Sequence, residues 1–170
     1  LFSISGDQLV VAGALDHEVS ASYQVTVRAT DSQNHAVDKV FVIGIGNLDD
    51  TAPVFSSAST ATFGENAMGV AYLAQAVDAD GLGAVTYELK GVDAALFDID
   101  AATGAVSFKA SPDFEAPADG DGDNLYDVVV TASDGVHSTD HAVAISVTNA
   151  VDVVGSVING TDGSETLVGT

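Results

Sequence analysis

The chain has 170 residues, room for one or two small domains, with 25 Asp and Glu against 4 Lys and Arg, a formal net charge of −21 at pH 7. Because 46% of the residues are hydrophobic, the composition excludes a disordered acidic tail, and the shortage of cationic side chains excludes a nucleic-acid partner. There is no cysteine and no apolar run long enough for a membrane span. The negative charges of such an acidic folded chain repel one another. Bound multivalent cations would relieve this repulsion; the alternative is a surface adapted to a saline medium.

The first predicted elements lie before residue 48. Alternating apolar residues on either side of Gly6 predict a hairpin, and alternation from Tyr23 to Ala29 and from Phe41 to Ile45 predicts two longer strands. A period of two with one polar face favours antiparallel strands in a sandwich.

The same landmarks recur about 100 residues later. Phe97 to Val106 repeats the hairpin, and the strands that begin at Tyr126 and Val143 repeat the two longer ones, so the chain contains an internal repeat. Nothing before Phe2 corresponds to residues 63–89, and we interpret the chain as a fragment that begins within a repeat.

These observations predict an all-β fold of immunoglobulin-like Greek-key β-sandwich repeats. We expect residues 1–52 to form the C-terminal half of one repeat plus a linker, and residues 53–152 to form a complete repeat. Residues 153–170 would be a further linker and the start of another motif. The only helical structure expected is a short turn at residues 94–97.

The ordered motifs resemble those of cadherin repeats over residues 1 to about 152. Residues 47–55 (Asn-Leu-Asp-Asp-Thr-Ala-Pro-Val-Phe) resemble the Asp-x-Asn-Asp-Asn-x-Pro-x-Phe linker, and residues 15–18 (Leu-Asp-His-Glu) resemble Leu-Asp-Arg-Glu. Residues 78–80 (Asp-Ala-Asp), 64–66 (Gly-Glu-Asn) and 132–135 (Ala-Ser-Asp-Gly) resemble Asp-x-Asp, Pro-Glu-Asn and Ala-x-Asp-x-Gly.

This resemblance implies a junction between repeats that binds Ca²⁺, for which the family provides three ions. Ca²⁺ takes six to eight oxygen ligands, mainly carboxylates and backbone carbonyls. The ligands carried over by position are Asp16 and Glu18 from the first repeat, Asp49 and Asp50 from the linker, and Asp78, Asp80 and Asp134 from the second, with Leu48 and Thr51 of the linker as candidate backbone carbonyl donors.

Each of these acids has a simpler interpretation as a solvated turn residue. That alternative weighs most for Asp31 or Asp134 taken alone, and least for the linker pair taken with Asp78 and Asp80. His17, at the family's Arg position, is interpreted as solvent-facing. His35, His137 and His141 are assigned no role in the site.

Three further segments are weaker candidates. Glu65, Asp113, Glu115 and Asp152 would begin a second junction, although no following cadherin repeat supplies its other half. Asp119, Asp121 and Asp123 alternate with glycines as in the first half of an EF-hand loop, but Val130 stands where the closing Glu is expected. A flexible acidic hairpin is the alternative there.

The tail from Asn159 to Thr170 resembles the opening of an RTX array, whose repeats bind Ca²⁺ in a β-helix of several copies. This resemblance indicates a large secreted bacterial adhesin of the RTX type.

Together these features predict a non-catalytic extracellular module, secreted or anchored at the cell surface, that Ca²⁺ stiffens for cell–cell (including homophilic) or cell–matrix adhesion. Its partners would be neighbouring repeats of the same chain, and beyond them another copy, a cell-surface protein or a polysaccharide. The alternative function is a carbohydrate-binding module, with Tyr72 and Tyr87 as candidate platform residues. A glycosidase is disfavoured, because abundant acids produce carboxylate pairs by chance.

Overall fold

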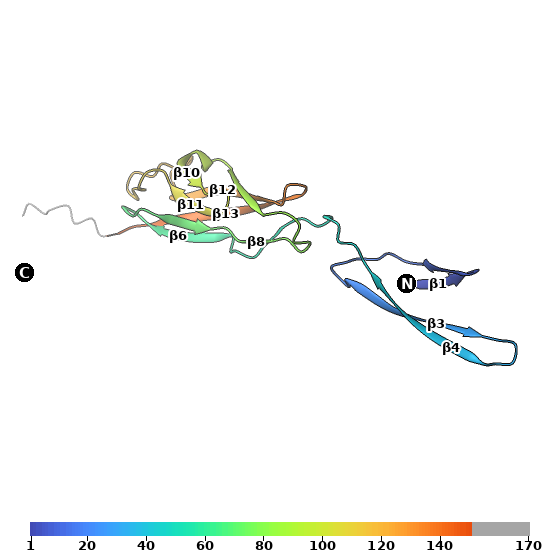
Figure 1. Cartoon of the computed structure of the whole chain (residues 1–170). Helices are drawn as coiled ribbons and strands as arrows, with labels where there is room; N and C mark the ends of the chain where they lie inside the picture. Colours follow the sequence, from blue (N-terminus) through green and yellow to red (C-terminus); the bar gives the residue numbers. More distant parts are fainter. Residues whose placement is uncertain (151–170) are drawn as a thin grey trace, which may run out of the picture.

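The computed structural model describes residues 1–150, which form two all-β parts joined by an extended linker (Figure 1). The first part consists of two antiparallel hairpins. Their strands are β1 (Phe2–Ser5), β2 (Gln8–Val11), β3 (Ser22–Thr30) and β4 (Ala36–Gly44). The hairpin predicted around Gly6 and the two longer strands are therefore confirmed.

The second part is a β-sandwich. Its elements are β5 (Val54–Phe55), β6 (Thr60–Gly64), β7 (Val70–Leu73), β8 (Ala76–Val77), β9 (Thr86–Lys90), the 3₁₀ turn η1 (Ala94–Leu96), β10 (Phe97–Ile99), β11 (Ala105–Phe108), β12 (Leu125–Ser133) and β13 (Ser138–Thr148). One sheet has the order β6-β13-β12-β9 and the other the order β10-β11-β7, with β5 and β8 forming a separate pair. The turn η1 lies where the sequence predicts a short helical turn.

The core lies between these two sheets. Alternate residues of β12, from Tyr126 to Ala132, are buried as the period-two pattern predicts, and Ile145 of the neighbouring strand β13 is 0% exposed. Phe108 of β11 packs against Tyr126 of β12 with ring centroids 5.0 Å apart at 90°, and against Phe97 at 4.2 Å. Aromatic rings therefore join the two sheets.

One strand pairing differs from the expectation of antiparallel strands. Strands β6 and β13 pair in parallel, from Ala144 opposite Thr60 to Thr148 opposite Gly64. Strand β6 lies near the start of the sandwich sequence and β13 is its last strand, and both run away from the linker (Figure 1). A parallel pair needs a long connection between its strands, which the intervening sandwich supplies.

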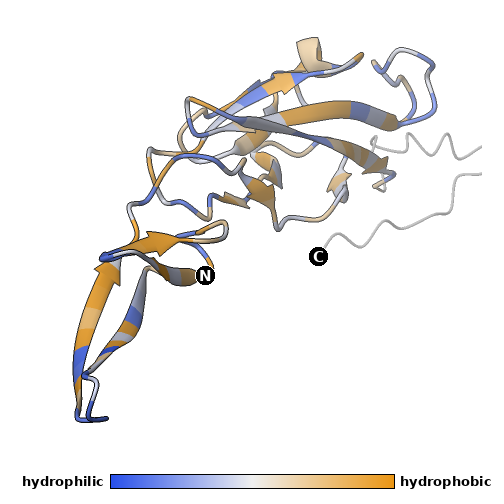
Figure 2. Ribbon diagram, turned by 90° about the vertical axis from the view of Figure 1, so that its right-hand side faces the viewer, coloured by the Kyte–Doolittle hydropathy of each residue, from blue (hydrophilic) through white to orange (hydrophobic). Residues whose placement is uncertain are grey.

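The hairpins of the first part expose much of their apolar surface. Figure 2 shows hydrophobic residues along β4, and Val37 and Val42 of this strand are 66% and 70% exposed. Phe2 and Tyr23 contact edge to face, with ring centroids 5.7 Å apart, and join the two hairpins. Within residues 1–52 the structure describes no second layer that buries this face. The assignment of these residues as the rear half of a repeat stays a prediction.

Candidate calcium junction

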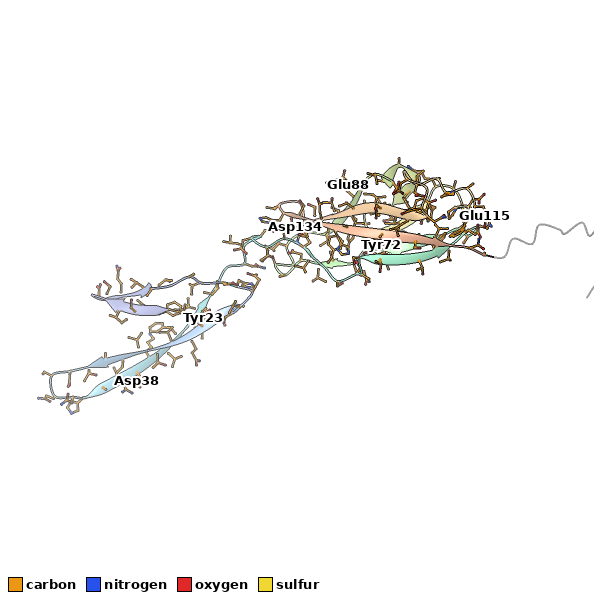
Figure 3. The ribbon with its side chains drawn as sticks, turned by 180° about the vertical axis from the view of Figure 1, so that it is seen from behind. Tyr23, Asp38, Tyr72, Glu88, Glu115 and Asp134 are labelled. Carbon is orange, nitrogen blue, oxygen red and sulfur yellow. The ribbon has the colours of Figure 1, made fainter. Side chains whose placement is uncertain are left out.

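The candidate junction is assembled by loops from four places in the chain, at the end of the sandwich that faces the linker. They are the turn between β2 and β3, the linker after β4, the loop between β8 and β9, and the turn between β12 and β13. Figure 3 shows Asp134 at this end of the sandwich and Glu115 at the opposite end.

Asp80 fastens the linker to the sandwich. It is 6% exposed, and its Oδ2 accepts hydrogen bonds from the Thr51 N–H (2.8 Å), the Thr51 hydroxyl (2.8 Å) and the Asp50 N–H (3.0 Å). The Asn47 amide donates to the Asp80 carbonyl at 2.8 Å. Burial raises the pKa of Asp80, but the donors from Thr51 and Asp50 together outweigh it and hold that pKa below its ordinary value. The group is therefore ionised at neutral pH.

Two groups of potential ligands lie around this contact. One oxygen from each of Glu18, Asp50 and Asp80 lies within 4.8 Å of the other two, so the turn between β2 and β3, the linker and the loop between β8 and β9 meet here. Ligand atoms of Asp49, Asp134 and His137 form a second group of the same size. These separations are suited to ligands that share one ion, since Ca²⁺ binds oxygens at about 2.3–2.6 Å.

Asp134 is held by its own turn. It is 8% exposed, and its Oδ1 accepts the Val136 and His137 N–H groups, both at 2.7 Å. The His137 N–H is the main cause of the lowered pKa of Asp134 and prevails over burial. Gly83 lies against this turn with φ of +94°, and a Cβ there would come within 2.7 Å of the Asp134 carbonyl oxygen. The close approach of this loop therefore requires glycine.

Buried polar atoms without a hydrogen-bond partner are concentrated at this junction. They are Asn47 Oδ1, Asp49 Oδ1, Asp78 Oδ2, Asp80 Oδ1, Asp134 Oδ2 and His137 Nδ1. All but the last are oxygen acceptors, and a buried acceptor without a donor is costly. Such a set of converging acceptors fits a hard cation with oxygen ligands.

No cationic side chain of the described residues takes that place. Arg28 pairs with Asp38, Lys90 with Glu88 and Lys109 with Asp98, while Lys39 lies over the ring of Phe41; these are all four Lys and Arg of the chain. His137 Nδ1 lies 3.4 Å from Asp49 Oδ1 and 3.9 Å from Asp134 Oδ2, and it forms a hydrogen bond with neither.

The structure places the remaining predicted junction residues less centrally. Asp78 lies beside the first group, where its Oδ1 accepts from the Asp80 N–H at 3.3 Å. Asp16 is outside both groups, and its Oδ1 accepts the Val19 N–H at 3.0 Å within its turn. Leu48 is 69% exposed, and Thr51 contributes its N–H and hydroxyl to Asp80.

Sequence reasoning missed two residues of the junction. Asn47 occupies the first position of the linker motif, where the cadherin pattern has Asp, so the motif itself contained the signal. His137 stands three residues after Asp134 in the turn between β12 and β13, a spacing that could have brought it into consideration.

The opposite end of the sandwich gathers the acids predicted for a second junction. Oxygens of Glu65, Asp113 and Glu115 lie within 4.8 Å of one another. Glu65 is 4% exposed and accepts the Phe114 and Ala150 N–H groups, which lower its pKa in that order. Its oxygens are thus satisfied, unlike those of the junction at the linker. Asp152 and the RTX-like tail lie outside the described residues.

Asp119, Asp121 and Asp123 form a fourth group, in the loop that precedes β12. This loop belongs to residues 109–124, an inserted connection between β11 and β12 that is longer than the one between β2 and β3, residues 12–21.

Comparison with known proteins agrees with the motifs. The chain is 32% identical to cadherin-23 of Rattus norvegicus over 149 residues, 82% of this chain and 4% of that protein. It is 37% identical to halomucin of Haloquadratum walsbyi over 94 residues, 53% of this chain and 1% of that protein. No family model matches the chain. The chain thus spans only a small fraction of the curated relatives that it matches.

Solved structures show the same architecture. The human mucin-like protocadherin EC1-2 matches with a TM-score of 0.65 at 15% identity, over 88% of this chain and 78% of that one. A protocadherin gammaB7 EC3-6 cis-dimer matches with a TM-score of 0.69 at 22% identity, over 86% of this chain and 39% of that one.

The fold is therefore the all-β sandwich of cadherin domains. In sequence the chain is similar to cadherin-23 over most of its length, and the described residues contain a cadherin-like domain.

Proposed function

We propose that the chain is a calcium-stiffened spacer and adhesion segment that works outside the cell. The observation that carries this proposal is the set of unpartnered acceptors at the junction, contributed by the linker and by two separate loops of the sandwich. In the described residues no helix is long and apolar enough to cross a membrane. We infer an extracellular or cell-surface location from the calcium chemistry and the cadherin-like fold.

The protein's own groups would act in two ways. Glu18, Asp50 and Asp80, with Asp78 beside them, would hold one ion between the first hairpins, the linker and the sandwich. Asp49 and Asp134 would hold another on the sandwich side. A bound divalent cation supplies the positive charge that these carboxylates lack. Carboxylates bridged in this way would fix the linker angle, because the ligands come from four separate turns or loops.

Such a junction would respond to the calcium concentration outside cells. Extracellular calcium modules bind with Kd of about 10⁻⁴–10⁻³ M, so these sites fill at millimolar external calcium and empty in the cytosol. The linker would then be stiff outside the cell and flexible in the cytosol, with no covalent change in the protein.

The partners proposed are neighbouring repeats of the same protein and, for adhesion, a second copy of it. The secreted RTX-type class of the parent protein is also a proposal, and it rests on the sequence of the tail alone. The module is proposed to be non-catalytic.

A role in carbohydrate binding has less support. Tyr72 is 7% exposed, and its hydroxyl lies 2.8 Å from Ser57 Oγ and 2.7 Å from the Ala58 carbonyl. The Tyr87 hydroxyl accepts the Ala76 N–H at 3.0 Å. Both candidate platform residues are therefore engaged within the sandwich.

Linker stiffness can be measured directly. The chain has no cysteine, so Gln33→Cys in the turn between β3 and β4 and Ala102→Cys in the turn between β10 and β11 provide unique positions for spin labels. The distribution of distances between the labels can be measured by double electron–electron resonance. We expect millimolar Ca²⁺ to narrow this distribution and EDTA to broaden it again. Asp80→Asn should keep the distribution broad in Ca²⁺. A distribution of the same width with Ca²⁺ and with EDTA would rule out the proposed role.

A further inference from the structure

We infer that the inserted loop of residues 119–124 is a calcium site of its own, contained within one repeat and separate from the linker junction. The site would take a hard divalent cation with oxygen ligands. Its existence does not depend on the junction being filled.

The first support is a buried oxygen without a partner. One oxygen from each of Asp119, Asp121 and Asp123 lies within 4.8 Å of the other two. Asp119 is only 7% exposed, and although its Oδ2 accepts the Asp123 N–H at 2.8 Å, its Oδ1 is buried without any hydrogen-bond partner. Asn124 Oδ1, in the same loop, is also buried and unpartnered. A cation bound among these carboxylates would satisfy the buried oxygens that have no hydrogen-bond donor.

The backbone of the loop turns so that alternate side chains converge. Gly122 and Asn124 have φ of +75° and +65°, the left-handed conformation that glycine and asparagine adopt most readily. The three carboxylates lie within 4.8 Å of one another, and a bound cation would relieve their mutual repulsion.

The loop is fixed to the sandwich at several points. Asp93, which is 4% exposed, accepts the Gly120 N–H at 3.0 Å through Oδ1 and the Asp127 N–H at 2.7 Å through Oδ2. The Asn124 amide donates to the Phe114 carbonyl at 2.9 Å, and the Asn124 carbonyl accepts the Val147 N–H at 2.9 Å. Asp93 is a positioning residue, since both its oxygens brace the two ends of the loop. Because these contacts already order the loop, ion binding costs less conformational entropy of the loop.

The loop and the junction lie at opposite ends of one strand. The loop precedes Leu125 and Asp134 follows Ser133, so the nine residues of β12 separate the two sites by about 30 Å at ~3.3 Å per residue. At the position where an EF-hand loop has its bidentate Glu, Val130 is 0% exposed within the core. Backbone carbonyls and water would complete the coordination, and we expect an affinity in the range of about 10⁻⁴–10⁻³ M.

The test uses the full 170-residue chain with the junction disabled by Asp50→Asn and Asp80→Asn. Calcium titrations followed by ¹H–¹⁵N NMR should shift the amide resonances of Gly120 and Gly122, and calorimetry should detect the remaining binding. Adding Asp121→Asn, at an exposed position, should weaken this binding at least tenfold. Adding Asp98→Asn, which removes one charge from β10, should leave it unchanged.

Two controls keep the inference open to refutation. Glu115→Gln tests the acidic group at the same end of the sandwich, and it should not alter the shifts of Gly120 and Gly122. The dispersed amide spectrum of each variant establishes that it is folded. If the two glycine resonances do not move at 10 mM Ca²⁺, or if Asp121→Asn binds as tightly as its parent, the loop is not a calcium site.

Discussion

The most decisive prediction concerns the calcium dependence of thermal stability. Asp80→Asn replaces a carboxylate by an amide of the same shape at the contact between the linker and the sandwich. Its Oδ1 is one of the unpartnered acceptors, and its Oδ2 accepts three hydrogen bonds from the linker. The substitution removes the charge that a cation requires and keeps the volume.

The magnitude follows from mass action. At a calcium concentration tenfold above Kd, one site adds about 1.4 kcal/mol to the free energy of unfolding. For a repeat of about 100 residues, each kcal/mol shifts Tm by about 4–8 °C, so one filled site raises Tm by about 6–11 °C. The calcium increment is the Tm in Ca²⁺ minus the Tm in EDTA. We expect this increment to be smaller in Asp80→Asn than in the wild type by at least the amount that one filled site contributes.

The assay is circular dichroism melting of the wild type, Asp80→Asn and the control Asp98→Asn, each in 5 mM Ca²⁺ and in EDTA. Comparing conditions within each variant cancels the effect of the substitution on the calcium-free protein. Asp98 is an exposed residue of β10 paired with Lys109, and its substitution should leave the calcium increment unchanged. An equal increment in wild type and Asp80→Asn would refute the role of Asp80, and no increment in wild type would refute the junction.

Three further predictions concern the loops and the core. Gly83→Ala should weaken calcium binding at the junction at least several-fold by calorimetry, because its Cβ would displace the Asp134 backbone; unchanged affinity would contradict the close contact. Backbone N–H groups of its own turn lower the pKa of Asp100, so this group stabilises the fold above the unfolded pKa of about 4, and the stabilisation is lost as pH falls through the lower folded pKa. The Tm difference between wild type and Asp100→Ala, measured in EDTA, should therefore shrink from pH 5 to pH 2, and a constant difference would argue against this linkage. Ile145→Ala should lower the free energy of unfolding by about 2–5 kcal/mol in urea, whereas the exposed Val42→Ala should change it by less than about 0.5 kcal/mol. Equal effects of these two substitutions would contradict the position of the core.

Much of this protein could be predicted from the sequence because its signals are local. Alternating apolar residues identify the face of β12 that enters the core, since successive side chains of a strand point to opposite sides. The hairpin around Gly6 and the turn at residues 94–97 follow from residue types next to one another. The acidic linker was recognised for the same reason, as its residues are contiguous.

The rest required the tertiary structure, because it depends on which distant segments meet. Strand β6 pairs in parallel with β13 only because the sandwich brings a strand from its start beside its last strand. Asn47 and His137 join the junction because the linker folds onto two loops of the sandwich; their positions beside the acidic motifs made them candidates, but only the fold shows the contacts. Burial distinguishes Asp119 from the solvated acids that resemble it in sequence. The sequence by itself determined how many acids the chain carries and where they lie along it; only the fold decided which of their oxygens face one another without a donor.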